Sequence, residues 1–290
     1  MSFQQQSPGQ ATVILNPSEL SPGDARCATA DLSRISFARI RSIEDPAFTM
    51  VYDFLHAEFG DAYEIETRNV LERRLQWQPE VAYTGYAMLY EMIAVFEDRR
   101  LIAARDHTAI VRTDLAEPGL TVVHLSHALI APDWRRSGVG GWLRALPIQT
   151  AGECLTRAGQ SPHLPITLVA EMEMLDASDP SRLARLSAYE KAGFLKIDRQ
   201  QLRYHQPDFR PPKLIDAAPP VRPLPMNLLL RRHGSPLSST LSGAEVRAIV
   251  DSIYTMYARE FRASDMQAVL SRVSPMPDDQ ASIALLAPTT

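Results

Sequence analysis

Glycine and arginine are concentrated in one short segment that follows a strongly apolar run. The segment Arg135–Gly141 reads Arg-Arg-Ser-Gly-Val-Gly-Gly, and it comes shortly after Leu-Ile-Ala-Pro at 129–132. Glycine lets a backbone turn tightly and approach a ligand closely, and the amides that open a helix are unsatisfied donors at its positive end. Two arginines add charge beside them. The segment predicts an anion-binding turn between a strand and a helix, of the kind that suits a diphosphate.

A second pattern lies downstream, where Tyr189 is followed by Gly193 and Phe194. Asp179 and Pro180 predict the start of a helix here, as a cap followed by proline in the first turn, and the glycine predicts its end. The pattern is therefore a helix that carries a tyrosine in its last turn and leads into a strand.

Together the two patterns resemble the GCN5-related N-acetyltransferase (GNAT) superfamily over roughly residues 35–232. Arg-x-x-Gly-x-Gly is similar to motif A of that family, and Tyr-x-x-x-Gly-Phe is similar to motif B. The resemblance implies acetyl-CoA as acyl donor, with its pantetheine arm paired to the strand at Leu129 and Ile130. It implies that the pyrophosphate is held by the following residues: Arg135, Arg136, Ser137, Gly138, Val139, Gly140 and Gly141.

The resemblance also implies that Tyr189 protonates the departing thiolate, although a tyrosine packed in the core would look the same in sequence. Acyl transfer to an amine needs a general base as well, because the attacking amine must lose a proton. Three residues are candidates for this base: His124, Glu171 and Glu173. The alternative is structural, since a lone strand histidine is often part of the core and alternating carboxylates often form a solvated face. His124 and Ser126 share one strand face, with His127 opposite unless a bulge intervenes.

Strand and helix signals alternate through the middle of the chain, which predicts a mixed α/β fold. Strands are expected near 35–43, 86–97, 100–112, 121–131, 165–174, 194–204 and 225–232, with helices near 45–59, 64–77, 138–158 and 179–193. Two of the strands form an antiparallel hairpin around Asp98 and Arg99. We therefore expect a GNAT-type, mostly antiparallel central sheet flanked by helices.

The ends of the chain differ in texture from this middle part. Residues 1–34 are rich in Gln, Ser, Pro and Gly and predict a flexible arm. The acyltransferase domain is expected at 35–232, with a proline-rich insert at about 206–225 that is not expected to hold regular structure. Residues 233–290 predict a helical C-terminal extension, because Ser242 and Glu245 form a capping box before an amphipathic run. That helix is expected to pack on the domain or on a second subunit, so a homodimer stays open.

Composition narrows the classes of partner. The 290 residues carry a formal net charge of −4, which gives no reason to expect nucleic acid or an anionic membrane. Two distant cysteines and the absence of a signal-like start or a long apolar span indicate a cytoplasmic protein. No histidine or cysteine spacing suggests a metal site.

The predicted function is acetyl transfer from acetyl-CoA to a primary amine, either a small molecule or a peptide, by direct attack. The alternative is a non-catalytic relative of the same fold that binds acyl-CoA as a sensor or scaffold. A longer acyl chain is also open.

Overall fold

A computed structural model describes residues 13–28, 31–114, 120–176, 178–234 and 238–290. The strands within these ranges are β1 (Ile35–Ile40), β2 (Tyr86–Glu97), β3 (Arg100–Arg112), β4 (Thr121–Ile130), β5 (Ile166–Glu173), β6 (Leu195–Ile197), β7 (Tyr204–Gln206), β8 (Leu224–His233), β9 (Thr240–Ser242) and β10 (Ser282–Leu286). They form the order β1-β2-β3-β4-β5-β8-β6-β10-β9, with β7 paired to β8. The β4–β5 pair is parallel and the other pairs are antiparallel. The predicted mixed, mostly antiparallel sheet is confirmed.

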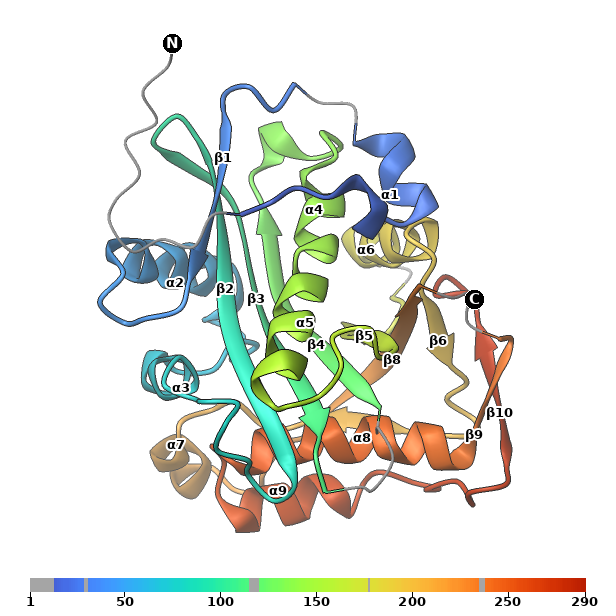
Figure 1. The fold of residues 1–290 in the computed structure, drawn as a ribbon. Coiled ribbons are helices and arrows are strands. Elements are labelled where there is room, and N and C mark those ends of the chain that lie inside the picture. Colours follow the sequence, from blue (N-terminus) through green and yellow to red (C-terminus); the bar gives the residue numbers. More distant parts are fainter. Residues whose placement is uncertain (1–12, 29–30, 115–119, 177, 235–237) are drawn as a thin grey trace.

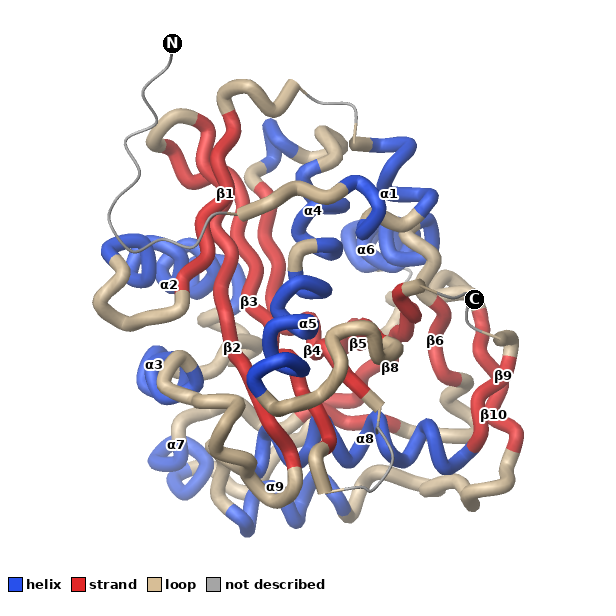
Figure 2. Tube along the Cα trace, viewed as in Figure 1, coloured by secondary structure: helices blue, strands red, loops and turns tan. Residues whose placement is uncertain are grey.

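Helices cover both faces of this sheet, as Figures 1 and 2 show. The α-helices are α1 (Pro22–Cys27), α2 (Pro46–Phe59), α3 (Arg68–Arg74), α4 (Val139–Ala145), α5 (Pro147–Arg157), α6 (Pro180–Lys191), α7 (Pro212–Ala217), α8 (Gly243–Ala258) and α9 (Ala263–Leu270), and the short 3-10 helices are η1 (Pro17–Glu19) and η2 (Pro132–Trp134). Apolar residues of α2, α3, α8 and α9 share one core with one face of β2. Residues of α5 and α6 share a second core with the other face. We call these the α8 face and the α5 face.

Local sequence explains where several helices begin. The side chain of Asp45 accepts a hydrogen bond from the amide of Ala47 (2.9 Å), and Ser242 accepts one from the amide of Glu245 (3.2 Å). Such caps satisfy amides that have no partner inside the helix. The residues of β5 alternate between the two faces of the sheet, because Ile166, Leu168, Ala170 and Met172 lie in the α5-face core and Val169 lies in the other core. Its two glutamates therefore face the other way.

Three expectations about individual elements were wrong. The helix expected over 138–158 is broken into α4 and α5 at Pro147, which cannot supply an amide hydrogen inside a helix. The strand expected over 194–204 is two short strands that pair with different parts of β8. The proline-rich segment 206–225 contains α7, because Pro211 and Pro212 occupy a helix start, where proline is tolerated.

The chain ends are more closely integrated than the sequence suggested. Residues 1–12 of the expected flexible arm lie outside the described residues, but 17–27 form η1 and α1, and Gly23 and Asp24 are buried. The C-terminal extension contains the predicted helix, yet it also adds β9 and β10 to the sheet. Its helix α8 buries its apolar side against the sheet of the same chain. No helix in the described part of the chain is both long and apolar enough to cross a bilayer.

We predict that the C-terminal extension contributes directly to global stability. Ile253 of α8 is 0% exposed, and Ile253→Ala should lower the free energy of unfolding by about 2–5 kcal/mol through lost burial and a residual cavity. Urea denaturation followed by circular dichroism measures this change. Leu270→Ala at the end of α9, where the side chain is 47% exposed, is the matched control and should change stability by less than about 0.5 kcal/mol. Equal effects for both variants would show that the extension does not belong to the core.

Candidate functional site

The sheet opens between its two parallel strands. Pairing of β4 with β5 runs from Thr121 and Ile166 to Leu125 and Ala170 and ends there, although β4 continues to Ile130 and β5 to Glu173. Beyond Leu125, no described strand pairs with this edge of β4. Backbone amides and carbonyls at such an edge are available to a ligand. The residues on either side of the opening therefore form the candidate site.

A β-bulge in β4 decides which side chains face the opening. Arg105 of β3 is paired with Ala128 of β4, and His107 is paired with Leu125. Asp106 alone therefore lies opposite two residues of β4, Ser126 and His127. The extra residue of a bulge reverses the facing of side chains after it. As a result His127 lies on the α8 face, where its ring centroid is 5.4 Å from that of Phe59 on α2. The open alternative for His127 is thus resolved in favour of the bulge.

His124, Ser126 and Glu171 form a hydrogen-bonded chain across the start of the opening. The Nε2 atom of His124 lies 2.9 Å from Oε2 of Glu171, and its Nδ1 atom lies 3.1 Å from Oγ of Ser126. An ionised carboxylate can only accept, so in a neutral ring Nε2 carries the hydrogen. The Nδ1 atom then accepts from the hydroxyl of Ser126. His124 is therefore oriented to take a proton from Ser126.

Glu171 is saturated with hydrogen-bond donors. Besides His124, it accepts from Tyr204 (2.5 Å), Tyr257 (2.6 Å) and Gln206 (3.0 Å). Burial alone would raise the pKa of this carboxyl group, but the histidine and these hydrogen bonds lower the pKa below its ordinary value. A carboxylate with four donors is poorly suited to take a further proton. Glu171 therefore orients and stabilises His124. Its partners from β7 and α8 are remote in the chain, and no local sequence pattern indicated them.

Glu173, the third base candidate, is held in an ion pair with helix α6. Its carboxylate accepts from Arg185 of α6 at 2.6 Å. Both residues line a cavity of about 300 Å³ that also includes Ser126, His127 and Glu171. The rest of its wall comes from the end of α2, the start of α6 and the strands beside them: Glu58, Phe59, Glu64, Ala128, Asp179, Ser181, Arg182, Gln206 and Met226.

This cavity is predominantly acidic. Arg182 and Arg185 are paired with Asp179 (3.2 Å) and Glu173 (2.6 Å), whereas Glu58 and Glu64 have no ion pair with another described residue. Burial raises the pKa of Glu64, and the charge of Glu173 raises it further. An ammonium group in the cavity would offset the repulsion between Glu64 and Glu173.

His127 carries a different kind of interaction. Its backbone amide and its Nδ1 atom lie 2.8 and 2.9 Å from Oδ1 of Asp106, and its Nε2 atom lies 2.8 Å from the carbonyl oxygen of Glu64. Burial would lower the pKa of His127, but Asp106 and Glu66 raise it to about 9. The same contact lowers the pKa of Asp106, against the effect of its burial. The pair is an ion pair at neutral pH, so His127 already holds its proton and cannot serve as a base.

Tyr189 lies on the α5 face of the opening. Its hydroxyl oxygen accepts a hydrogen bond from Nη2 of Arg105 on β3 at 2.9 Å, and its ring lies 5.5 Å below the guanidinium of Arg144 on α4. A guanidinium only donates, so the tyrosine hydrogen remains free to be donated. Arg105 is 1% exposed, and its Nε and Nη1 atoms have no partner among the described residues. Nothing in the sequence around Arg105 signalled this role.

The segment 135–141 adopts the turn that its sequence predicted. Arg136 (φ 66°) and Gly138 (φ 89°) are left-handed, with Ser137 between them, and η2 leads in from β4. When left-handed residues alternate with residues of negative φ, successive backbone amides point into one concavity, which suits an anion. Val139, Gly140 and Gly141 form the first turn of α4, which has only seven residues, so the loop conformation matters more than a helix dipole. Leu129 and Ile130 pair with Ala104 and Ala103 of β3 through one edge.

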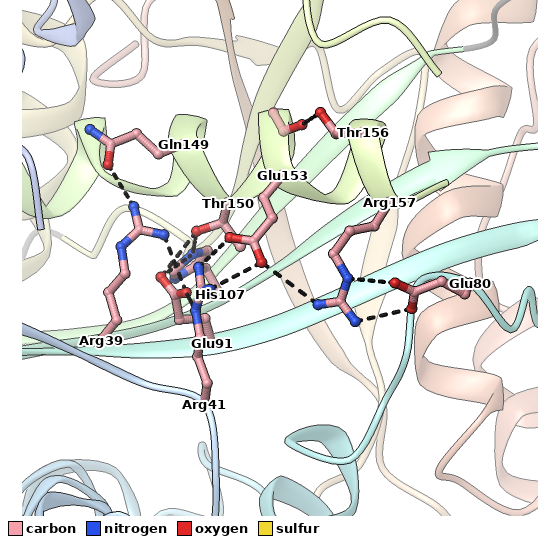
Figure 3. Close-up of polar contacts among 11 residues, drawn as sticks. Arg39, Arg41, Glu80, Glu91, His107, Gln149, Thr150, Glu153, Thr156 and Arg157 are labelled. Atoms are coloured by element: carbon pink, nitrogen blue, oxygen red, sulfur yellow. Dashed lines mark hydrogen bonds and ion pairs between the residues drawn. The ribbon is translucent and has the colours of Figure 1, made fainter. Parts of the chain in front are cut away.

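A second polar cluster, between α5 and β1–β3, is shown in Figure 3. Its centre is Glu91, which is 0% exposed and forms ion pairs with Arg39 (3.3 Å) and Arg41. His107 lies against Thr150 with Nε2 and Oγ1 2.8 Å apart, and burial lowers the pKa of the histidine. The charges compensate one another, so the cluster fastens α5 to the sheet. The described residues include no group of three or more His, Cys, Asp or Glu side chains placed to hold a metal ion.

Comparisons with known proteins match this chain through structure alone. No family model and no curated protein matches it. It is similar to the ribosomal-protein-S18-alanine N-acetyltransferase of Escherichia coli (14% identity, TM-score 0.36, 70% of this chain and 96% of that one). It is also similar to Naa50 of Arabidopsis thaliana in complex with the bisubstrate analogue CoA-Ac-MVNAL (10%, 0.38, 68% and 98%). A GNAT-family acetyltransferase of Streptococcus pneumoniae matches as well (14%, 0.34, 69% and 99%). These likenesses are weak, at 10–14% identity and TM-scores of 0.34–0.38, and the chemistry of the site rests on the residues of this chain alone.

We predict that the ion pair between His127 and Asp106 makes stability depend on pH. The pKa of His127 is about 9 in the folded protein and 6.5 ordinarily, so its stabilisation is complete below about pH 6.5 and is lost as the pH rises towards 9. Each unit of difference corresponds to about 1.4 kcal/mol. Urea denaturation across this range should show a fall in wild-type stability that His127→Gln lacks.

The exposed residue His163 supplies the control for this experiment. His163→Gln should retain the wild-type dependence of stability on pH. If His127→Gln retained it too, the ion pair would not be its source.

Proposed function

We propose that this chain is an acyl-CoA-dependent N-acyltransferase that transfers an acetyl group from acetyl-CoA to a primary amine by direct attack. The observation that carries the proposal is the opening between β4 and β5, which has different chemistry at its two faces. A histidine oriented to accept a proton lies on the α8 face, and a tyrosine with a free hydrogen lies on the α5 face. Acyl transfer from a thioester to an amine needs one group of each kind.

The residues of the α5 face fit an acyl carrier of this type. The loop 135–140 offers a concavity of backbone amides for a diphosphate, and Arg144 and Arg231 add charge nearby. The free edge of β4 at Leu129 and Ile130 suits an amide-containing arm. When bound, acetyl-CoA supplies an activated acyl group, so the chain mainly has to position the reactants and move protons.

The proposed base is His124, acting through Ser126. The hydroxyl of Ser126 lies at the cavity wall and donates to Nδ1 of His124. It can accept the proton of the attacking amine as it passes its own proton to the ring. Glu171 then stabilises the imidazolium through Nε2 at 2.9 Å. Of the three base candidates, His124 is the one whose ring is linked to the cavity wall through a hydroxyl group, that of Ser126.

Tyr189 is the proposed acid. As the carbon–sulfur bond breaks, its hydroxyl hydrogen passes to the sulfur, and the proton released from the amine restores the balance through His124 and solvent. Arg105 donates to the tyrosine oxygen and stabilises the negative charge that develops there. Arg105 is thus a positioning residue for Tyr189.

The acceptor is proposed to be cationic in solution. Glu58 and Glu64 lie in the wall of the acidic cavity next to Ser126, which favours an ammonium group over a neutral or anionic acceptor. Two other acidic residues nearby do not contribute to the acidity of this wall. Asp61 is exposed outside the wall, and Glu66 is paired with Arg74 at 2.6 Å. A peptide amino terminus and a small polyamine both satisfy this chemistry.

We predict that His124→Gln lowers kcat for acetyl transfer by about 10²–10⁴-fold while the affinity for CoA stays unchanged. The reason is that glutamine fits the strand but cannot take a proton. Release of CoA thiol with a panel of primary amines measures kcat, and calorimetry measures affinity. His205→Gln, at a half-buried histidine on β7, is the control and should keep wild-type turnover.

The same assay separates the enzyme from its alternative. Tight CoA binding by the wild type without thiol release across a broad amine panel would identify a sensor or scaffold of this fold. Turnover that persists in His124→Gln would contradict the assignment of the base.

We predict that Gly140→Val weakens CoA binding by at least about tenfold, because a branched side chain then stands where the diphosphate must approach the backbone. A Cβ atom at this position meets the flexible end of Ile130 at 3.2 Å and the guanidinium of Arg144 at 3.6 Å, both of which are side-chain ends that can shift, so the fold should be retained. Gly152→Val on α5, where nothing lies within 4 Å of such an atom, is the matched control. Equal CoA affinity in both variants would rule out the loop as the diphosphate site.

A further inference from the structure

The short N-terminal helix α1 packs against α4 and against the end of α6, and Figure 1 shows it beside both helices. We call the place that it occupies between them the groove. A Cβ atom added to Gly23 would stand 1.6 Å from the carbonyl oxygen of Lys191 at the end of α6. One added to Gly138 would stand 2.5 Å from the carbonyl oxygen of Cys27, and one on Gly141 would stand 3.0 Å from Cβ of Asp24. The backbones are therefore in direct contact on both sides of the groove. We call residues 21–28 the strap.

The strap brings one negative charge to two arginines inside the groove. Asp24 is 4% exposed and forms ion pairs with Arg144 of α4 (2.5 Å) and Arg231 of β8 (3.4 Å). Burial lowers the pKa of Arg231 to about 10, although Asp24 acts in the opposite direction. Removing the carboxylate alone would leave two largely buried cations without a partner, which is unfavourable. The groove thus needs an anion, and the strap provides it.

The chain just before the strap is fastened to α5. Gln149 donates from Nε2 to the carbonyl oxygen of Ile14 (2.7 Å) and to Glu19 (2.8 Å). Its amide oxygen accepts from Arg39 at 2.7 Å, and Figure 3 shows this contact at the edge of the polar cluster. These contacts lie on one side of the groove, so the strap can leave it while the preceding segment stays in place.

The strap covers the positions that the proposed function gives to the acyl carrier. It touches the loop at Gly138 and the first turn of α4, and Asp24 bonds Arg144, whose guanidinium lies over Tyr189. Arg105, which donates to the same tyrosine, still has two nitrogen atoms without a partner in the described structure. The arginines around Tyr189 on this face therefore have more donors than the carboxylate of Asp24 satisfies.

We propose that the strap is an autoinhibitory segment that closes the acyl-CoA groove, and that acyl-CoA binds only after displacing it. The anionic groups of the carrier then replace Asp24 as partners of Arg144 and Arg231. This inference rests on the proposed function, because it assumes the nature of the carrier. Two mutually exclusive anions on one pair of arginines make a two-state switch, and the closed state raises the apparent Kd by the inverse of the open fraction.

Gly23→Val tests the inference in the full-length protein. A side chain at Gly23 cannot coexist with the carbonyl of Lys191, so the strap must leave the groove. Calorimetric titration with CoA should then show at least about tenfold tighter binding, the factor expected if the strap is open in one wild-type molecule in ten. Ala25→Val adds the same side chain at an exposed position of the strap and should bind as the wild type does.

Cys27 provides a readout that does not depend on turnover or on a variant. It is exposed, whereas the other cysteine, Cys154, is buried with its pKa raised to about 12 by burial, so a nitroxide reagent labels Cys27 selectively. Electron paramagnetic resonance should show a label that becomes more mobile when CoA is added. Asp24→Asn should show part of this mobility without CoA, since it removes the charge that holds the strap.

The outcomes separate the two proposals. Tighter binding by Gly23→Val together with CoA-dependent mobility supports the strap. If CoA binds the wild type and Gly23→Val equally and the label does not respond, the strap does not compete with the carrier, while the proposed function stands. If CoA binds neither protein, the carrier is wrong, and the proposed function and this inference fall together.

Discussion

The separation of β4 from β5 after Leu125 and Ala170 is the constraint on which the rest of the site depends. A continuous ladder would satisfy the backbone groups of both strands and leave nowhere for a ligand to lie within the sheet. The bulge opposite Asp106 occurs at the point where pairing ends, and it turns His127 to the α8 face. The ion pair that His127 forms there fixes the bulged backbone in turn. A local irregularity in one strand thus sets the geometry of both faces of the opening.

Buried charge around this opening is stabilised by groups from distant parts of the chain. Glu171 of β5 depends on Tyr204 of β7 and on Tyr257 of α8, so the C-terminal extension completes the orientation of His124. On the opposite face, Asp24 from the N-terminal segment neutralises arginines from α4 and β8. Both terminal segments therefore contribute to the site. Isolated buried charges are costly, which explains why segments remote in sequence remain packed there.

Much of the fold follows from local signals in the sequence. Capping residues and alternating apolar residues located the hairpin of β2 and β3, the helices α2, α6 and α8, and the facing of β5, because these signals act over a few residues. The loop conformation at Arg136 and Gly138 agrees with its glycine-rich sequence. The resemblance to GNAT acetyltransferases rested on that loop and on Tyr189.

Other features depend on contacts between remote residues and left no trace in local sequence. The choice among His124, Glu171 and Glu173 required knowing that Tyr204, Tyr257 and Arg185 reach the carboxylates. The segment 13–28 reads as a flexible arm because Pro, Ser and Gly interrupt its apolar residues without periodicity, yet the ion pairs of Asp24 with Arg144 and Arg231 help to hold it in place.

The central claim is that the opening and the adjoining groove receive an acyl carrier whose diphosphate lies on the loop 135–140. A crystal structure of the full-length protein grown with CoA tests this most directly. The account predicts CoA between β4 and β5, its diphosphate on the amides of that loop, its sulfur near Tyr189, and α1 displaced from the groove. CoA bound elsewhere on the molecule, with Asp24 still paired to Arg144 and Arg231, would contradict it.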